Sequence, residues 1–441
     1  MIWPAEQHKG RLRTAPLWGA FCVFMTGAVC LAGALCMAGG AASTAHAGSN
    51  WDFPLSSGYD IYVHDYFLAE SDTTEVIQEF NFTAAANGSS EFSARNRWFM
   101  RAGLSGGTEL YRQSLDTGFR LRNKERHEWL RGDLLMLARQ FREGSEYSLS
   151  SNNHEGRMTG ALSPWTTDNM AVELRARGRY VNYQRPSTLE VDYVDGSAGA
   201  YLRSPSRSFR TWRVGGLYTA RDYPDSGAID REGFILEGDY DHGRLEGVLR
   251  AYHRSERRNI ADPDARPSAW FHWTELDTAH PTSRAEVVLR ASSEVWDYDE
   301  ASGAWYDSWQ LGGQAGARWG DPLNTRVETL ITAEHLEAGD EPETYWQTGL
   351  RVGAETLKPE LSGSISIEVG RRWYRNSTDD PDSFALEYTD YSYLAFWLMG
   401  NWMINEHFSV DVTANFEPES HTEQDDNITL GYGSLRLVWR P

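Results

Sequence analysis

Few residues in this chain could perform catalysis, and they form no recognisable set. Gly103-Leu104-Ser105-Gly106-Gly107 fits the pattern Gly-x-Ser-x-Gly, but a nucleophile elbow needs a strand-to-helix turn on a parallel sheet. The flanking residues predict a turn between two antiparallel strands instead. The histidines after residue 47 are scattered, and the sequence has no Gly-Lys phosphate loop and no His-Glu-x-x-His zinc pattern. We therefore expect a protein that is not an enzyme.

Metal ligands are equally sparse. The three cysteines are Cys22, Cys30 and Cys36, all near the N-terminus. Acidic segments supply the hard oxygen ligands that Ca²⁺ prefers, and Asp379, Asp380 and Asp382 are the best of these weak loop candidates. They could also share divalent cations with lipopolysaccharide. Solvated acidic loops explain such segments more simply, so we expect neither a cofactor nor a dedicated metal site.

The first 47 residues have the pattern of an export signal. Lys9, Arg11 and Arg13 are followed by an apolar run over residues 15–42 and by the small-x-small cleavage pattern Ala45-His46-Ala47. The alternative is a retained membrane anchor, since the run could span a bilayer. Cleavage would remove every cysteine, so the mature protein could form no disulfide, bind no metal through Cys and carry no c-type haem.

Composition excludes further classes of protein. The 441 residues contain 63 acidic and 42 basic side chains, which gives a net charge of −21. A chain this acidic is a poor ligand for nucleic acid, because it has no basic excess to displace counterions from phosphates. Only 40% of the residues are hydrophobic, yet 18 are Trp and 21 are Tyr. This aromatic content argues against disorder, because burial of aromatic rings can offset the entropy lost on ordering.

Apolar and polar residues alternate with period two along the rest of the chain. Such alternation predicts β-strands with one apolar and one polar face, and we count about twenty candidates between Tyr59 and Trp439. In the first of the four clearest candidates, the apolar face carries Phe92, Ala94, Trp98, Met100 and Ala102 and the polar face carries Arg95, Arg97 and Arg101. In the other three, the apolar and polar faces carry, respectively, Tyr111, Leu115, Phe119 and Leu121 with Arg112, Asp116, Arg120 and Arg122; Met170, Val172, Leu174, Ala176 and Tyr180 with Glu173, Arg175, Arg177 and Arg179; and Phe408, Val410, Val412, Ala414 and Phe416 with Ser409, Asp411, Thr413 and Asn415.

The predicted connections alternate between long and short from residue 220 onward. The long ones are Arg221–Glu232, His253–Ser268, Ser293–Gly303, Glu337–Glu343, Trp373–Phe384 and Glu417–Asn427, and the short ones are Asp241–Gly243, Ala279–Ser283, Gly320–Asn324, Lys358–Glu360 and Asn405–His407. Earlier turns, near Leu104–Gly107, Asn123–His127, Gly144, Ser163–Asp168 and Gln184–Ser187, are all short, and Ser145–Ala161 is the least strand-like stretch. Strict alternation is typical of up-and-down barrels that cross an outer membrane.

These features predict an all-β fold: a transmembrane antiparallel up-and-down β-barrel with an even number of strands, about 18–20. A bilayer offers the backbone no hydrogen-bond partner, so only helices or closed sheets cross it, and no apolar run of helical length follows the first 47 residues. We expect residues 1–47 to be a signal peptide, 48–58 a short N-terminal periplasmic segment and 59–441 a single barrel domain. A soluble exported β-protein is the alternative.

In its signal peptide, its cysteine-free mature part and its alternation of loop lengths, the chain resembles Gram-negative outer-membrane β-barrel proteins of the porin-like kind. Its end, with Gly433 followed by Leu435, Leu437 and Trp439, resembles the signal read by the barrel-assembly machinery. In that family the aromatic residue ends the chain, whereas here Arg440 and Pro441 follow it. The resemblance implies an outer-membrane location, contact with membrane lipid and lipopolysaccharide, and assembly by that machinery.

Charge is unevenly distributed along the predicted strands. Residues 48–90 carry seven acids and no base, residues 91–213 carry 20 bases and 14 acids, and residues 214–441 carry 19 bases and 41 acids. The expected pore-lining residues are Arg95, Arg97, Arg101, Arg112, Arg120, Glu173, Arg175, Arg177, Arg179, Glu237 and Asp239. If the strands close in order, an Arg-rich inner wall faces a wall and loops rich in acid, and the field between them orients and filters solutes. The alternative is a closed lumen filled by Arg–carboxylate pairs.

The sequence therefore predicts an outer-membrane channel for passive passage of small polar or charged solutes, because about twenty strands enclose a water-filled lumen. One alternative is a sheath or export barrel that encloses a periplasmic partner, such as a cytochrome or a polysaccharide. Another is a barrel enzyme: a lipid hydrolase would place His and Ser on the lipid-facing side, and His272, between Trp270 and Thr274, comes nearest. The stretch Arg221–Glu232 is interpreted as a long polar hairpin loop.

Overall fold

Antiparallel β-strands make up nearly all of the described part of the chain. The computed structural model describes residues 49–440 except 69–70, 94–95, 108–109, 123–127, 142–151, 185–190, 205–209, 245–246, 301–304, 322–323, 340–342, 376–387 and 422–427. The strands are β1 (Ser49–Asp52), β2 (Leu55–Leu68), β3 (Ser71–Ser93), β4 (Asn96–Gly107), β5 (Leu110–Arg122), β6 (Glu128–Phe141), β7 (Asn153–Thr166), β8 (Ala171–Tyr183), β9 (Tyr193–Arg203), β10 (Arg210–Asp222), β11 (Arg231–Arg244), β12 (Gly247–Ile260), β13 (Ala269–Pro281), β14 (Glu286–Tyr298), β15 (Ser308–Gly320), β16 (Thr325–Glu337), β17 (Tyr345–Leu357), β18 (Leu361–Tyr374), β19 (Tyr391–Met403), β20 (Phe408–His421) and β21 (Ile428–Trp439). A 3₁₀ turn, η1 (Gly227–Ile229), lies between β10 and β11. Within these ranges, no helix has the length and apolar character needed to cross a membrane.

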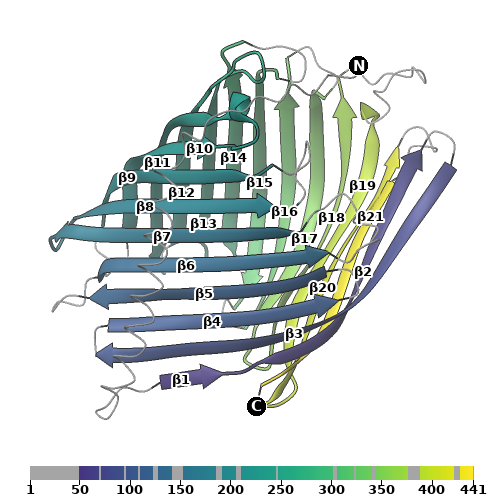
Figure 1. Cartoon of the computed structure of the whole chain (residues 1–441). Helices are drawn as coiled ribbons and strands as arrows, with labels where there is room; N and C mark the ends of the chain where they lie inside the picture. Colours follow the sequence, from purple (N-terminus) through teal and green to yellow (C-terminus); the bar gives the residue numbers. More distant parts are fainter. Residues whose placement is uncertain are drawn as a thin grey trace.

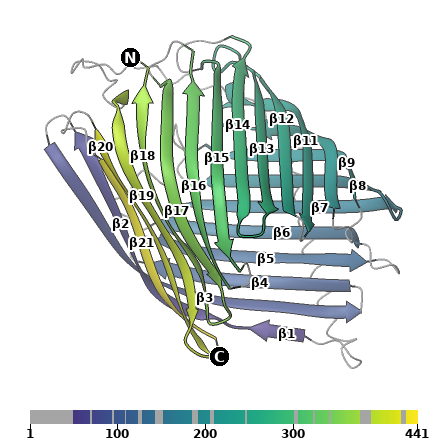
Figure 2. The same cartoon turned by 180° about the vertical axis from the view of Figure 1, so that it is seen from behind.

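Strands β2 to β21 close into a barrel of 20 antiparallel strands. Each pairs with the strand that follows it, and β2 closes the cycle by pairing with β21, for example Tyr59 opposite Leu435. The short β1 lies outside this cycle and pairs with the last part of β3. In Figures 1 and 2 the strands of one wall, β4–β9, cross those of the opposite wall steeply, because a sheet closes only when its strands are tilted. The predicted all-β up-and-down barrel is confirmed.

The two ends of the barrel differ in the length of the intervals between strands. We call the end with the longer intervals the loop end and the other the turn end. At the loop end, the intervals from β6 onward are 142–152, 184–192, 223–230, 261–268, 299–307, 338–344, 375–390 and 422–427. At the turn end they are 123–127, 167–170, 204–209, 245–246, 282–285, 321–324, 358–360 and 404–407, and β2 begins and β21 ends there. The predicted alternation of long and short connections is therefore confirmed, and it extends back to β6.

Several predicted boundaries are wrong because strands continue toward the loop end beyond their apolar residues. The sequence predicts a loop over His253–Ser268, but β12 continues to Ile260 through a run of polar and charged side chains. The predicted loop Ser293–Gly303 likewise contains the last part of β14. The stretch Ser145–Ala161, expected to be the least strand-like, contains the beginning of β7.

The first strands need three further corrections. Gly103–Gly107 is not a turn but the end of β4, and Ser105 lies opposite Arg112 on antiparallel β5. The alternation in Phe92–Ala102 spans the interval 94–95 between β3 and β4. A two-residue connection leaves the phase of the alternation unchanged, so periodicity alone cannot locate it. The segment 48–58 contains β1 and the first residues of β2.

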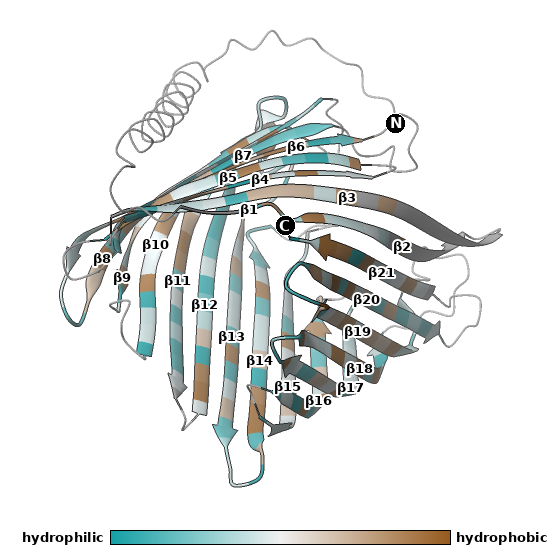
Figure 3. Cartoon of the chain, turned by 90° about the horizontal axis from the view of Figure 1, so that it is seen from below, coloured by the Kyte–Doolittle hydropathy of each residue, from teal (hydrophilic) through white to brown (hydrophobic). Residues whose placement is uncertain are grey.

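Side chains alternate between an outward and an inward face along each strand. On β10 and β11, Val214, Phe234 and Leu236 are exposed on the outward face, whereas Leu217 and Ile235 are buried on the inward face. Figure 3 shows this alternation as brown and teal bands along single strands. Exposed apolar residues continue around the outward face at Val287, Leu311, Ile331, Leu350, Ile367, Leu394 and Leu435. The barrel therefore has an apolar exterior and a polar interior.

Backbone contact between neighbouring strands leaves no room for a side chain at some glycines. A Cβ atom at Gly316 on β15 would lie 1.9 Å from the carbonyl oxygen of Thr329, whereas one at Gly156 on the outward face of β7 would meet nothing within 4 Å. We expect Gly316→Val to destabilise the barrel by about 1–3 kcal/mol, as overpacking does, and Gly156→Val to have no effect. Heat-modifiable gel mobility across a urea series measures both. Equal urea midpoints for the two variants would contradict the close approach of β15 and β16.

Two bidentate arginine–carboxylate pairs, which we call clamps, connect segments at the loop end. Arg257 on β12 donates to both oxygens of Asp299 at 2.7 and 2.5 Å, and Arg375 binds Glu337 in the same way at 2.6 and 2.5 Å. Asp299 lies just beyond the end of β14. The hydrogen bonds from Arg257 hold the pKa of the Asp299 carboxyl below the usual range.

This depressed pKa makes the first clamp sensitive to acid but not to base. A carboxyl with a lowered folded pKa stabilises the fold above its unfolded pKa and loses that contribution as pH falls through the folded pKa. Since an unfolded Asp titrates at about 3.9 and the folded pKa of Asp299 lies below this value, we expect the Arg257–Asp299 clamp to stay closed at neutral pH and to open only when the pH falls below the folded pKa. Hydrogen exchange of the peptide that contains Asp299, corrected for intrinsic rate, should then be slow at pH 7 and fast at about pH 2. In Asp299→Asn it should be fast at both; slow exchange in that variant at pH 7 would rule the clamp out.

Candidate functional site

The inward faces of β4 to β9 carry more arginines than carboxylates. The arginines are Arg97, Arg101, Arg112, Arg120, Arg131, Arg139, Arg157, Arg175, Arg177, Arg179 and Arg203, and the carboxylates are Asp116, Glu128, Asp133, Glu155, Glu173 and Asp195. Alternation puts every second residue of a strand on this face, and antiparallel register places residues of neighbouring strands side by side. The arginines therefore form one continuous surface, the guanidinium wall.

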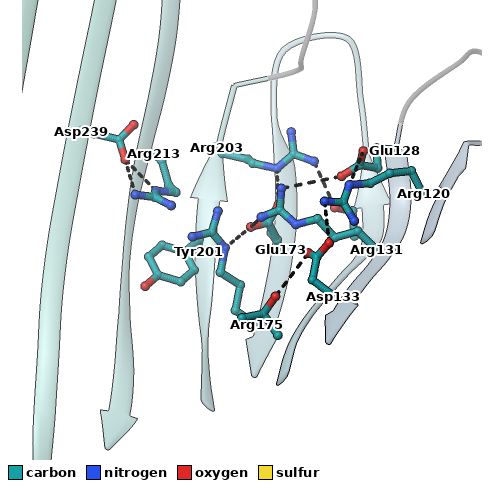
Figure 4. A network of polar contacts seen from close by, with 12 residues as sticks. Arg120, Glu128, Arg131, Asp133, Glu173, Arg175, Tyr201, Arg203, Arg213 and Asp239 are labelled. Carbon is teal, nitrogen blue, oxygen red and sulfur yellow. Dashed lines mark hydrogen bonds and ion pairs between the residues drawn. The ribbon is translucent and has the colours of Figure 1, made fainter. Parts of the chain in front are cut away.

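Glu173 on β8 is the centre of the ion-pair network on the guanidinium wall (Figure 4). Its side chain is buried, with only 3% exposed. Arg203 donates to it at 2.8 Å, Arg131 lies 3.5 Å away, and Arg175 on the same strand also pairs with it. One buried carboxylate thus compensates three cations from β6, β8 and β9. Loss of its charge would leave three guanidinium groups without their shared partner.

Two more buried carboxylates repeat this arrangement on either side of Glu173. Glu155 on β7 receives a hydrogen bond from Arg179 at 2.6 Å and also pairs with Arg157. Glu256 on β12 lies between Arg254 at 2.6 Å and Arg258 at 2.8 Å. In each case one carboxylate is shared by at least two guanidinium groups, so each cluster has a net positive charge.

A cavity of about 300 Å³ is hollowed into the guanidinium wall. Its polar lining includes the side chains of Arg120, Arg131, Arg175, Arg177 and Arg254, together with the carboxylates of Asp133 and Glu237. Its apolar floor is the buried cluster of Tyr201, Leu217 and Ile235. Guanidinium groups bind carboxylate and phosphate oxygens through paired N–H donors. The cavity therefore has the chemistry to hold a small anion with an apolar part.

Five arginines of the wall, Arg97, Arg101, Arg112, Arg139 and Arg177, form no ion pair within the described part of the chain. Arg177 donates to Ser197 Oγ at 2.9 Å, and the guanidinium of Arg101 lies 5.8 Å from the ring centroid of Phe99. For Arg177, Arg101 and Arg112, no carboxylate among the described residues lies within ion-pair distance. These three side chains keep their full charge toward the lumen.

On the opposite wall two carboxylates are held by hydroxyl groups, whereas Glu286, Glu328 and Glu355 pair with arginines. Glu368 on β18 accepts hydrogen bonds from Thr332 at 2.9 Å and from Tyr393 at 2.8 Å. Tyr345 donates in the same way to Glu334 on β16. A hydroxyl satisfies a carboxylate oxygen without cancelling its charge. Glu334 and Glu368 therefore keep their negative charge on the inward face of this wall.

All predicted pore-lining residues that the structure describes face inward, and Arg95 lies outside the described residues. Arg120, Glu173 and Arg175 belong to the network shown in Figure 4, and Arg179 belongs to the neighbouring cluster at Glu155. The remaining partners are Ser89 for Arg97 at 3.3 Å, Tyr201 for Glu237 at 2.8 Å and Arg213 for Asp239 at 2.6 Å. The part these residues play in solute passage stays a prediction.

Sequence reasoning missed several members of the wall. Arg131, Arg203 and Arg254 line the cavity or the network, and Glu155 and Glu256 are its buried carboxylates. A signal was present, because Glu155-x-Arg157 and Arg254-x-Glu256-x-Arg258 alternate with period two. The second pattern lies in a stretch interpreted as a loop and the first in the stretch expected to be the least strand-like, so their inward face was not recognised.

The other predicted sites receive less support from the geometry. Gly433, Leu435, Leu437 and Trp439 share the outward face of β21, and their recognition by an assembly machinery stays a prediction. Asp379, Asp380 and Asp382 lie in 376–387, outside the described residues. In the part of the chain that is described, no three His, Cys, Asp or Glu side chains are grouped so as to hold a metal ion.

Comparison with solved structures finds the same fold in outer-membrane proteins. The chain matches the apoprotein form of the FrpB iron transporter from Neisseria meningitidis with a TM-score of 0.57 and 10% identity, covering 89% of this chain and 81% of that one. It matches the copper transporter OprC with a TM-score of 0.53 and 10% identity, covering 90% and 80%. It matches OccK2 from Pseudomonas aeruginosa with a TM-score of 0.47 and 9% identity, covering 89% of this chain and 98% of that one. No protein-family model and no curated protein matches the chain.

These matches extend to the fold and not to a ligand, because their sequence identities are so low. The chain has the fold of Gram-negative outer-membrane β-barrel proteins, as its sequence pattern predicts. In outer-membrane barrels of this fold, the end with long loops faces the cell exterior and the end with short turns faces the periplasm.

Proposed function

We propose that the protein is an outer-membrane channel through which small polar or charged solutes diffuse, with a preference for anions. The observation that carries this proposal is the cavity of about 300 Å³ on the inner wall, lined by five arginines. An interior that only needed to be filled would be expected to neutralise its charges in pairs. Here Arg101, Arg112 and Arg177 keep their charge instead.

The two inner walls would act together on a passing solute. Fixed charges of opposite sign on facing walls of a narrow aqueous lumen produce a transverse field that orients dipolar solutes and concentrates one sign of ion at each wall. An anion would move along the guanidinium wall, where successive arginines offer it bidentate donors. Because the sites are multiple and water-accessible, an anion could enter and leave without being trapped.

Planar-bilayer recording of the purified full-length protein tests this function directly. We expect stepwise conductance and, across a KCl gradient, a reversal potential whose sign reports chloride as the more permeant ion. Heat-modifiable mobility of the same sample shows that the barrel is folded. A folded barrel without conductance, or with a reversal potential of the opposite sign, would refute an anion-preferring channel.

A further inference from the structure

Four polar side chains form a hydrogen-bonded cluster on the outward face of β12 and β13. His253 and Ser255 belong to β12, and His272 and Thr274 lie directly opposite them on β13, Ser255 facing His272 and His253 facing Thr274. Ser255 Oγ lies 2.9 Å from His253 Nε2 and 2.8 Å from His272 Nδ1. His253 Nδ1 lies 2.9 Å from Thr274 Oγ1. We call these four residues the His–Ser cluster.

The His–Ser cluster lies in a wall that is largely apolar at this height. On β11, Leu236 lies opposite Ser255 and Gly238 opposite His253, and on β14, Val295 lies opposite His272 and Ser293 opposite Thr274. Leu249 and Leu289 continue the exposed apolar surface toward the turn end. Polar side chains that face lipid cost free energy and are therefore rare outside functional positions. Four of them joined in one network need a reason beyond packing.

The hydrogen bonds assign a different role to each side chain. A serine hydroxyl has one proton, so it can donate to only one of the two imidazoles and must accept from the other. His253 is the imidazole whose second nitrogen is held, by Thr274; no described residue holds Nε2 of His272. A nucleophile, a base within hydrogen-bond reach and a group that orients the base make up the arrangement by which a serine is activated. Ser255, His253 and Thr274 supply these three parts.

The height of the cluster on the wall selects the substrate class. Arg257 on β12 and Trp270 on β13 each lie two residues nearer the loop end than Ser255 and His272. They pack together, with the guanidinium 5.8 Å from the ring centroid. Trp and Arg at the edge of an apolar band mark the headgroup level of a membrane. Residues two apart on a strand are separated by about 6.6 Å, so Ser255 lies one such step below the headgroups. The ester bonds that join acyl chains to headgroups lie at this depth.

We propose that the His–Ser cluster is a catalytic site that hydrolyses acyl esters of lipids in the outer leaflet. Ser255 Oγ attacks the ester carbonyl carbon while His253 Nε2 takes the hydroxyl proton. The carbon–oxygen bond to the headgroup then breaks, and the leaving alkoxide takes that proton from His253. Water, deprotonated by His253 Nε2, attacks the acyl-serine carbonyl carbon; the bond from that carbon to Ser255 Oγ breaks, Oγ takes the proton from His253, and the fatty acid leaves. His272 Nδ1–H is a donor within reach of the developing oxyanion.

This activity is independent of solute passage and departs from the sequence-based expectation of no enzyme. That expectation rested on a search for linear motifs, whereas these four residues come from two strands and meet only through their register. It also rested on placing 253–268 in a loop. Corrected strand boundaries bring His253 and Ser255 onto the lipid-facing surface beside His272, the histidine that the sequence had singled out.

Two measurements on the full-length folded protein test the catalytic site. The first is covalent labelling by a fluorophosphonate probe, located by mass spectrometry, which needs no knowledge of the natural lipid. We expect the label on Ser255. The second is release of free fatty acid from phospholipid vesicles and, in a separate arm, from purified lipopolysaccharide. The arm that reacts identifies the lipid, and we expect Ser255→Ala to lower its rate by at least about 100-fold.

A matched control separates catalysis from a change in the wall. Ser392 is an exposed serine on the outward face near the loop end of β19, and Ser392→Ala should retain both labelling and release. Thr274→Val should lower kcat without raising KM, because Thr274 positions the base and does not touch the substrate, and Thr274→Ser should restore kcat. The proposal is overturned if folded wild-type protein is neither labelled nor active on either lipid, or if Ser255→Ala is as active as the wild type.

Discussion

Glu173→Gln will lower the free energy of unfolding of the barrel by about 3–5 kcal/mol, the cost of removing one partner of a buried ion pair. The side chain is almost fully buried, and the substitution keeps its size and shape. It removes the negative charge that Arg131, Arg175 and Arg203 share. Three guanidinium groups on three strands then repel one another where little water reaches them. The loss of unfolding free energy is large because one substitution removes the partner of three guanidinium groups at once.

An exposed ion pair on the same inner surface provides the control. Arg250 and Asp241 lie 3.3 Å apart, with side chains 61% and 50% exposed. Since exposed pairs contribute at most about 1 kcal/mol, Asp241→Asn should be nearly neutral. Urea-induced unfolding in lipid vesicles, followed by tryptophan fluorescence, compares the two variants. If Glu173→Gln and Asp241→Asn unfold at the same urea concentration, Glu173 is not the centre of the network.

The fold could be predicted from the sequence because period-two alternation survives in strands with one lipid-facing and one water-facing side. The pattern around Glu173 to Arg179 and around Phe408 to Phe416 matches the faces of β8 and β20. The pattern failed where polar residues stand on the outward face of a strand. His253 and Ser255 replace apolar residues on the outward face of β12, and the polar run was then interpreted as a loop.

The candidate sites were predictable only in part, because both depend on register across strands. The inward direction of Arg175 and Arg177 follows from alternation within one strand. The partnership of Glu173 with Arg131, 42 residues earlier, depends on how β6, β7 and β8 align, and no local pattern encodes it. The same holds for Ser255 and His272, which lie on different strands.

Neutralising three of the unpaired arginines of the guanidinium wall will reduce the anion preference of the channel several-fold. Arg101→Gln, Arg112→Gln and Arg177→Gln combined remove positive charge from the guanidinium wall without leaving a carboxylate unpaired, so the barrel should stay folded. Focusing of counter-ions by a charged lumen raises their local concentration by about 10-fold or more. In the triple variant, the local concentration of anions in the lumen should be much lower. The difference should shrink in 1 M salt, where the screening length falls to about 3 Å.

An outward-facing arginine gives the matched control for this variant. Arg371 lies on the lipid-facing side of β18, with its guanidinium 5.7 Å from the ring centroid of Trp373. Arg371→Gln changes the net charge by one unit at a surface that no permeating ion contacts. Its reversal potential should equal that of the wild type. A shift in this control would show that total charge, and not the inner wall, determines selectivity.

The reversal potential of single channels in a tenfold KCl gradient at low salt, compared among wild type, the triple variant and Arg371→Gln, tests the central claim most directly. An arginine-lined lumen predicts chloride preference in the wild type and in Arg371→Gln, and a potential near zero or of the cation-preferring sign in the triple variant. The same potential in all three folded proteins would contradict it.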